Sequence, residues 1–313
     1  MSKKLFEADS INTLYLKLIK EISQNPEYIT FPRGLECKEI LNVTIRLTQP
    51  KNCLTTLKAR HLNYAFTIIE KLEYLSGRTN PNRMIFYNSN YKSWLNELEY
   101  FDGAYPDRLQ YWYIHIYHLL KKDRDTRQAV MTIYGPQDRH LSKDIACTCT
   151  LQFLIRNNKL FFTVYMRSQD LLWGFPYDVN AFCFLQEAMA AVLNIELGTF
   201  TLHVGSEHLY TERETQLLDI LDSSNIHLNI KNPSFDAPLD FYELRTNLEL
   251  FWYLEDKMRR NKLKPSILKM KNELLFPLEK YFDILWAYKL KKEAKGSINE
   301  ENLKTKYNKI LLL

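Results

Sequence analysis

DIACTCTLQFLIRNNKLFFTVYMRSQDLLWGFPYD, residues 144–178, combines two predicted strands with several chemically reactive side chains. Two alternating apolar runs, at 150–155 and 160–166, flank the turn-like sequence RNNK. Alternation rich in Phe, Val, Tyr and Ile predicts strands, and two adjacent asparagines between such runs predict a hairpin. Cys147 precedes the first strand, and Arg167 begins a polar segment after the second. A stiff hairpin with reactive groups at its ends is a suitable scaffold for chemistry.

The composition indicates a folded protein with a sizeable core. Of the 313 residues, 46% are hydrophobic and 13% are aromatic, which argues against a disordered chain. The length suits one large domain or two small ones. The 8 glycines, with neither a GxGxxG sequence nor a P-loop, argue against a glycine-rich nucleotide-binding loop. The net charge of +5 suits an anionic small substrate as well as nucleic acid, so it decides little.

The cysteines and the amino end indicate a reducing, cytoplasmic setting. The 5 cysteines are irregularly spaced, which predicts free thiols. They are Cys37, Cys53, Cys147, Cys149 and Cys183. The first ten residues lack the apolar centre of a signal peptide, and no run has membrane-spanning length. We therefore expect no membrane association.

Helical and strand patterns alternate along most of the chain. Helices are predicted at 11–24, 57–76, 107–122 and 177–194, and strands at 40–47, 128–134, 199–210 and 227–232. From about residue 238 the pattern changes to long charged helices, at 238–260 and 264–292, and a lysine-rich tail at 298–313. We expect an α+β domain at 1–237 with a large mixed or antiparallel sheet, and a C-terminal helical extension at 238–313 packed on it.

Three residues outside the hairpin have both a structural and a functional interpretation. Arg33, beside a glycine in a polar break, is either a solvated loop arginine or a phosphate ligand. Glu70 lies between apolar residues of a predicted helix, so it is either a paired structural acid or a proton-handling group. Trp94 belongs to an aromatic segment that either packs in the core or lines a pocket for a flat ligand.

The order of the reactive groups along the chain favours the functional interpretation of these residues. A Cys-x-Cys sequence before a strand is followed by an Arg-Ser-x-Asp-x-x-x-Gly-x-Pro run and a Gly-x-x-His-Leu-Tyr run. Glu70 followed by GRTN at 77–80, and Asp125-Thr126-Arg127, are weaker matches. Over about residues 14–232, this order resembles the thymidylate synthase superfamily. The resemblance implies a thymidylate synthase-like catalytic domain whose sheet forms the interface of a homodimer.

By this resemblance, Cys147 is the nucleophile that adds to C6 of a pyrimidine nucleoside monophosphate, and Glu70 manages protons through ordered water. A thiol needs cationic help to ionise at neutral pH, which Arg167 can supply. A zinc or disulfide role for Cys147 and Cys149 is disfavoured, because no other ligands lie nearby in sequence. The resemblance also assigns 5,10-methylenetetrahydrofolate as cofactor, bound near Asp170, with Trp94 as an aromatic wall.

The resemblance further implies a phosphate clamp and a sugar site. The clamp consists of Arg33, Arg127, Arg167 and Ser168, and Arg127 is expected to reach across the dimer interface. The family has a second arginine after the one matching Arg127, and here it is Gln128, so the clamp loses one charge. His208 and Tyr210 match the pair that holds the sugar 3′-hydroxyl. No direct binding of nucleic acid is expected.

Asp178 occupies the position expected to select the base. Thymidylate synthases have asparagine there, and its amide accepts from uracil N3–H and donates to O4. A carboxylic acid instead donates to cytosine N3 and accepts from N4, or a carboxylate pairs with cytosine protonated at N3. The structural alternative is that Asp178 caps the following helix. An aspartate here resembles the cytidylate hydroxymethylases of phages and of nucleoside-antibiotic pathways.

The sequence therefore predicts a transferase that converts dCMP, methylenetetrahydrofolate and water to 5-hydroxymethyl-dCMP and tetrahydrofolate. Cys147, Glu70 and Asp178 are its expected catalytic residues. One alternative is the same chemistry on CMP or dUMP, or a thymidylate synthase-like methylation. Another is a non-catalytic nucleotide-binding module whose C-terminal helices and basic tail bind a partner.

Overall fold

The computed structural model describes residues 3–110, 112–139, 143–230, 232–235 and 237–294. The chain forms two compact units, residues 1–228 and 229–313. The first unit contains the sheet and helices α1 to α7, and the second contains α8 to α10. The domain boundary expected after residue 237 stays a prediction.

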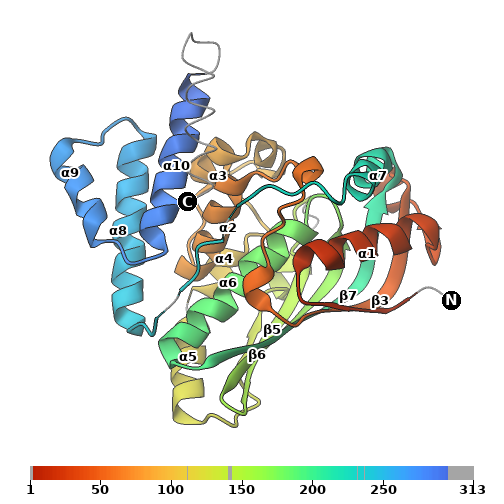
Figure 1. Cartoon of the computed structure of the whole chain (residues 1–313), viewed down its shortest axis with the longest axis horizontal. Helices are drawn as coiled ribbons and strands as arrows, with labels where there is room; N and C mark the ends of the chain where they lie inside the picture. Colours follow the sequence, from red (N-terminus) through yellow and green to blue (C-terminus); the bar gives the residue numbers. More distant parts are fainter. Residues whose placement is uncertain (1–2, 111, 140–142, 231, 236, 295–313) are drawn as a thin grey trace. The chain divides into compact units, whose positions relative to one another are not determined.

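The described part of the first unit is built on one seven-stranded mixed sheet. The strand order is β1-β3-β7-β6-β5-β4, and β2 pairs with β3. β1 pairs with β3 and β6 with β7 in parallel, and the other pairs are antiparallel (Figure 1). The strands are β1 Leu5–Ala8, β2 Tyr28–Thr30, β3 Cys37–Leu47, β4 Val130–Thr132, β5 Thr148–Arg156, β6 Lys159–Asp170 and β7 Glu196–Tyr210. The expected mixed sheet is thus confirmed.

The predicted hairpin is formed by β5 and β6. Asn157 and Asn158 connect the two strands, with φ angles of 49° and 58°. Two consecutive left-handed residues make the type I′ turn that matches the twist of a hairpin, and asparagine tolerates this conformation. The turn fixes the register, so Leu151 pairs with Val164 and Phe153 with Phe162.

Helices of the first unit pack on this sheet. Their bounds are α1 Ile11–Gln24, α2 Tyr64–Ser76, α3 Pro81–Tyr87, α4 Tyr105–Leu109, α5 Trp112–Lys122, α6 Phe175–Leu193 and α7 Glu214–Asp222. α6 is apolar on most faces and almost entirely buried, as its sequence predicts. It lies against β6 and β7, and both α1 and α2 pack against it (Figure 1). The helix therefore connects the sheet to the rest of the core.

Three expected elements differ from the structure. α2 begins at Tyr64 rather than residue 57, because the Asn63 side chain caps it by accepting from the Phe66 N–H. The expected helix at 107–122 is divided between α4 and α5. Among the described residues of the expected strand at 227–232, His227 forms an isolated bridge to Leu57 and none lies in a strand.

The second unit is helical, as expected. It contains α8 Phe241–Arg259, α9 Pro265–Lys269 and α10 Leu278–Glu293. The helix predicted at 264–292 is broken, because Pro277 cannot donate a backbone hydrogen bond and α10 starts after it. Phe251 of α8 meets Phe282 of α10 edge to face, with ring centroids 6.4 Å apart.

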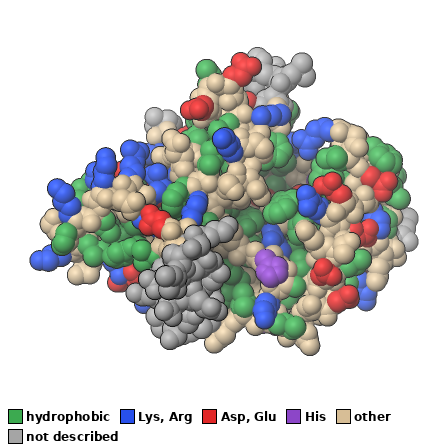
Figure 2. Space-filling view, turned by 90° about the horizontal axis from the view of Figure 1, so that it is seen from above, with side chains coloured by type: hydrophobic (Ala, Val, Ile, Leu, Met, Phe, Trp, Pro, Cys, Tyr) green, Lys and Arg blue, Asp and Glu red, His purple; other side chains and the backbone are tan. Residues whose placement is uncertain are grey.

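Basic side chains are frequent at 257–271 in this unit, and blue side chains gather on the left of Figure 2. The lysine-rich tail predicted at 298–313 lies outside the described residues. No helix in the described ranges is long and apolar enough to span a membrane.

Candidate active site

Backbone hydrogen bonds fix the position of Cys147. The residue directly precedes β5 and is half-buried. The Tyr105 hydroxyl accepts from the N–H groups of Cys147 and Thr148, at 3.1 and 3.0 Å. The Arg167 N–H donates to the Cys147 carbonyl at 2.8 Å. The thiol is therefore held in place from α4 on one side and β6 on the other.

We predict that Tyr105→Phe lowers the free energy of unfolding by about 1–3 kcal/mol, because two backbone N–H groups lose their acceptor. Urea unfolding measures the change. Tyr28→Phe is the matched control, since Tyr28 is 49% exposed and its loss of a hydroxyl should have little effect. Equal stability of the two variants would mean that water replaces the Tyr105 oxygen without cost.

The environment of the Cys147 thiol is only partly cationic. Burial raises the pKa of Cys147, whereas the Arg167 charge and a hydrogen bond from Ser168 lower it. The Ser168 hydroxyl donates to Cys147 Sγ at 3.5 Å. Arg167 is itself held by the carbonyl groups of Ala146 and Ile145, both at 2.9 Å. Arg167 thus acts in the predicted direction, but burial outweighs it in the nucleotide-free protein.

Glu70 lies in the same buried region. Its side chain is 5% exposed, and the Tyr91 hydroxyl donates to Oε1 at 3.2 Å. Oε2 has no hydrogen-bond partner among the described residues. Burial raises the pKa of Glu70 well above its usual value, and the Asp178 charge raises it further. Glu70 therefore holds its proton more strongly than an ordinary glutamate, which suits a group that handles protons.

Asp178 contacts β6 instead of capping its helix. Gly174, not Asp178, is the residue at the helix start, so the capping interpretation is wrong. Gln169 Nε2 donates to Asp178 Oδ2 at 2.9 Å. Burial raises the pKa of Asp178 to about 6. The group can therefore be a hydrogen-bond donor in part of the population at physiological pH.

Gly174 permits the contact between Gln169 and Asp178. A Cβ at this position would lie 2.5 Å from Gln169 Nε2 and 3.2 Å from Asp178 Oδ2. Any larger residue would push the amide away from the carboxyl. Steric exclusion of a side chain therefore explains why the Gly-x-Pro sequence of this chain has glycine at position 174.

The predicted phosphate and sugar ligands meet at the ends of β3 and β7. Arg33 Nη2 donates to the Tyr210 hydroxyl at 3.4 Å. The rings of His208 and Tyr210 lie edge to face, with centroids 5.3 Å apart. Asp170 pairs with His208 in the parallel register of β6 and β7. Arg33, His208, Tyr210 and Asp170 therefore gather at one edge of the sheet.

Arg127 lies away from this group within the protomer. Gln152 Nε2 donates to the Arg127 carbonyl at 3.0 Å. Gln152 is four residues beyond Thr148 on β5, which corresponds to ~13 Å along the strand. The Arg127 side chain is exposed. The structure thus does not bring Arg127 to the Cys147 thiol of its own chain.

Two exposed tryptophans lie in segments that carry site residues. Asp170 Oδ1 accepts from the N–H groups of Leu172 and Trp173, both at 2.7 Å. The Trp173 side chain is 49% exposed. Trp94, 40% exposed, ends the 3-10 helix that also carries Tyr91. These aromatic surfaces are available to a flat ligand.

Sequence reasoning missed several partners of the predicted residues. They are Tyr91, Tyr105, Gln169, Trp173 and Glu207. Gln169 and Glu207 stand at the unspecified x positions of the two motifs, directly before Asp170 and His208. A polar residue at such a position could have indicated a role in the site. Nothing local marks Tyr91 and Tyr105 among 20 tyrosines.

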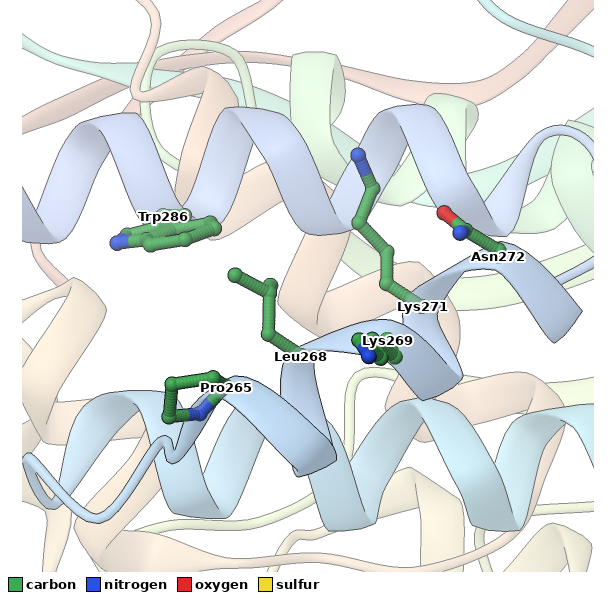
Figure 3. A pocket seen from close by; sticks show the side chains of 6 residues that line it. All are labelled: Pro265, Leu268, Lys269, Lys271, Asn272 and Trp286. Atoms are coloured by element: carbon green, nitrogen blue, oxygen red, sulfur yellow. The ribbon is translucent and has the colours of Figure 1, made fainter.

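Thiols and acids do not assemble into a metal site in the described ranges, which hold no cluster of three or more His, Cys, Asp or Glu suited to a metal ion. All five cysteines lie in the described ranges, and none of them forms a disulfide. A separate hollow of the C-terminal unit, with a cavity volume of about 340 Å³, is lined by Pro265, Leu268, Lys269, Lys271, Asn272 and Trp286 (Figure 3). It contains neither thiol nor carboxylate, so it is not the predicted nucleotide site.

Residues 13–253 match the family model described as thymidylate synthase. The chain belongs to the thymidylate synthase family. The match includes all the site residues above and continues into α8 of the second unit. The family assignment expected from the ordered motifs is therefore confirmed.

Named relatives within this family include hydroxymethyltransferases. The chain is 32% identical over 226 residues to a deoxyuridylate hydroxymethyltransferase of Bacillus phage SP01, covering 66% of this chain and 59% of that protein. It is 29% identical over 202 residues to another of Delftia phage PhiW-14, covering 58% and 56%. A putative thymidylate synthase of Methanocaldococcus jannaschii is 28% identical over 210 residues, covering 66% and 90%. The chain thus spans less than two thirds of either phage protein.

Proposed function

We propose that this protein transfers a hydroxymethyl group from methylenetetrahydrofolate to C5 of dCMP. The observation that carries the proposal is the half-buried Asp178 carboxyl, which accepts from Gln169 and has its pKa raised to about 6. The charge of Asp178 also raises the pKa values of Cys147 and Glu70, so the three groups lie close together. A base read by Asp178 would therefore lie within reach of the thiol.

A neutral Asp178 matches cytosine better than uracil. Its hydroxyl can donate to N3, and its other oxygen can accept from the N4 amino group. Uracil presents N3–H and O4, so O4 would face a carboxyl oxygen with no proton between them. A buried site built around such a hydrogen bond can reject the mismatched ligand by up to about 10⁴-fold.

Cys147 would supply covalent activation. Addition of its thiolate to C6 makes C5 nucleophilic. The folate, when bound, would supply a one-carbon unit and depart as tetrahydrofolate, and loss of the C5 proton would leave an exocyclic methylene on C5. Water then adds to this methylene, and departure of Cys147 from C6 releases 5-hydroxymethyl-dCMP. The Arg167 charge and the Ser168 hydroxyl stabilise the thiolate at both ends of this cycle.

Glu70 would manage the proton of the attacking water. Its pKa lies well above the usual range, which suits a group that exchanges protons near neutral pH. The Tyr91 hydroxyl holds Oε1, so Oε2 remains for water. The carboxyl is thereby oriented before the nucleotide binds.

Two groups of side chains would bind the nucleotide, one its phosphate and the other its sugar. Arg33, Arg167 and Ser168 would bind phosphate, and His208 and Tyr210 the sugar hydroxyl. Arg127 would come from the partner of a homodimer, because its own chain places it ~13 Å along β5 from the nucleophile. Phe161, Thr163 and Tyr165 of β6 alternate with buried residues and remain partly exposed, which suits a sheet face that pairs with a second copy.

The folate would be held beside Asp170. Oδ1 of this residue is occupied by two backbone N–H groups, so Oδ2 is left for a donor of the pterin. Trp94 and Trp173 offer exposed aromatic surface to its rings. The residues present thus fit a flat ligand with hydrogen-bond donors.

A second candidate is the same reaction on dUMP. Two relatives are named deoxyuridylate hydroxymethyltransferases, which favours this base by similarity. We place dCMP first because the Asp178 carboxyl, with its raised pKa, has the donor that N3 of cytosine requires.

The decisive experiment supplies the protein with methylenetetrahydrofolate and dCMP, CMP or dUMP, and identifies products by mass. A hydroxymethyl product from dCMP supports the proposal. A methyl product with dihydrofolate would eliminate the water-addition step, and a preference for dUMP would eliminate the role of Asp178. Binding of nucleotide without any product would indicate a non-catalytic module.

The preference for dCMP should fall as the pH rises. Above a pKa of about 6 the free Asp178 loses the proton that cytosine requires, so kcat/KM for dCMP relative to dUMP should drop by about tenfold per pH unit. Ionisation of Cys147 also increases with pH and raises kcat/KM for both nucleotides. It cancels in the ratio, because both substrates need the same thiolate. Steady-state rates between pH 6 and 8 test this, and a ratio independent of pH would contradict it.

A further inference from the structure

Glu207 is a buried acid with no role in the chemistry described so far. It lies on β7, its side chain is 0% exposed, and neither carboxyl oxygen has a hydrogen-bond partner among the described residues. A buried polar group without a partner costs free energy and needs a physical explanation.

Gln169 is its neighbour on β6. The two residues are paired in the parallel register of β6 and β7. Paired positions lie ~4.8 Å apart, with side chains on the same face of the sheet. Gln169 is 1% exposed and its Oε1 also lacks a partner among the described residues, while its Nε2 donates to Asp178. Two unsatisfied acceptor groups therefore lie side by side.

Protonation resolves this conflict. Burial raises the pKa of Glu207 well above its usual value, and the charges of Asp170 and Asp178 raise it further. A carboxylic acid has one O–H donor, and the amide oxygen of Gln169 is an acceptor that needs one. The missing hydrogen bond is thus supplied by a single proton.

We propose that Glu207 is a positioning residue for base selection: as a neutral acid it donates to Gln169 Oε1 and so holds Gln169 Nε2 toward Asp178. This inference rests on the proposed role of Asp178. With Nε2 facing Oδ2 of Asp178, that oxygen is an acceptor, so the Asp178 proton is placed on Oδ1. A flipped Gln169 would present Oε1 instead and draw the proton to Oδ2, away from the base.

In this chain of hydrogen bonds, Glu207 donates to Gln169 and Gln169 donates to Asp178. Gly174 keeps this order compact, because a side chain there would collide with Nε2. A fixed amide gives Asp178 one donor and one acceptor in a constant arrangement. That is the arrangement that separates cytosine from uracil.

Two substitutions at one position test the proposal. In Glu207→Gln the side-chain amide still donates to Gln169, so the ratio of dCMP to dUMP dissociation constants should stay within about threefold of the wild-type ratio. In Glu207→Leu the donor is absent, and the ratio should change toward dUMP by about tenfold or more. Calorimetric titration measures both constants without requiring turnover.

A purely structural role predicts a different pattern. If Glu207 only stabilised the fold, Glu207→Leu would lower the midpoint of urea unfolding and leave the ratio of dissociation constants unchanged, so a lost preference without a lower midpoint identifies positioning. If Glu207→Leu keeps the wild-type ratio, or if Glu207→Gln loses it equally, the proposal is wrong.

Infrared spectroscopy of the nucleotide-free protein tests the proton separately. The wild type minus Glu207→Gln spectrum should show a carboxylic-acid C=O band, and a carboxylate band in its place would overturn the proposal. The two proposals can fail independently. A wild type that favours dUMP refutes dCMP as substrate, whereas the difference between the two Glu207 variants still decides the role of Glu207.

Discussion

Turnover of dCMP should fall by about 10⁴-fold or more in Cys147→Ala, while binding of the nucleotide is retained. The loss is large because the proposed covalent step needs the Cys147 thiol, whose backbone N–H is held by Tyr105 and whose sulfur accepts from Ser168. Product analysis by mass gives the rate, and calorimetric titration gives the affinity.

Cys149→Ala is the matched control for this variant. Cys149 lies two residues further along β5 and is likewise half-buried. Its removal should change turnover by no more than about threefold, the scale of an ordinary local change. Product formation by Cys147→Ala, or equal losses in both variants, would refute Cys147 as the nucleophile.

Asp178→Asn should move the base preference from dCMP toward dUMP by up to about 10⁴-fold in kcat/KM. The asparagine amide donates to O4 and accepts from N3–H of uracil, but it faces cytosine N4 and N3 with the wrong groups. In this arrangement the asparagine Nδ2 replaces the oxygen that accepts from Gln169, so the Gln169 amide has to turn over and present Oε1 to it. Competition between the two nucleotides in one reaction measures the preference directly.

Glu70→Gln separates base selection from catalysis. Glu70 is buried and Asp178 is half-buried in the same site, but only Asp178 accepts from Gln169. Glu70→Gln should slow both nucleotides alike and leave their ratio unchanged. An Asp178→Asn variant with the wild-type preference would show that another group reads the base.

Local signals in the sequence predicted the framework of the site. The asparagine pair at 157–158 and the apolar alternation around it specify the β5–β6 hairpin without help from distant residues. The buried helix α6 follows equally directly from its uniform apolar character. Ordered motifs then predicted which residues gather at the sheet edge, and the structure places Arg33, Asp170, His208 and Tyr210 there.

Features that depend on distant contacts were not predictable in the same way. Asn63 caps the start of α2, and the segment before it is also held away from a helix by the bridge between Leu57 and His227, far away in the sequence. Tyr105 supports Cys147 from 42 residues away, and Tyr91 supports Glu70 from 21. No periodicity in the sequence reports such pairs, because they arise only when α2, α4 and the sheet pack together.

Parallel pairing of β6 with β7 also has an evolutionary consequence. It joins positions 169 and 207, which are distant in the sequence, at a place where Asp178 contacts the first of them. A substitution that removes or reverses a donor or acceptor at one of the three alters the hydrogen bonds open to the other two. Base specificity in such a sheet is therefore expected to be inherited as a co-varying triplet, in which a change of base selection at position 178 favours later adjustment at positions 169 and 207.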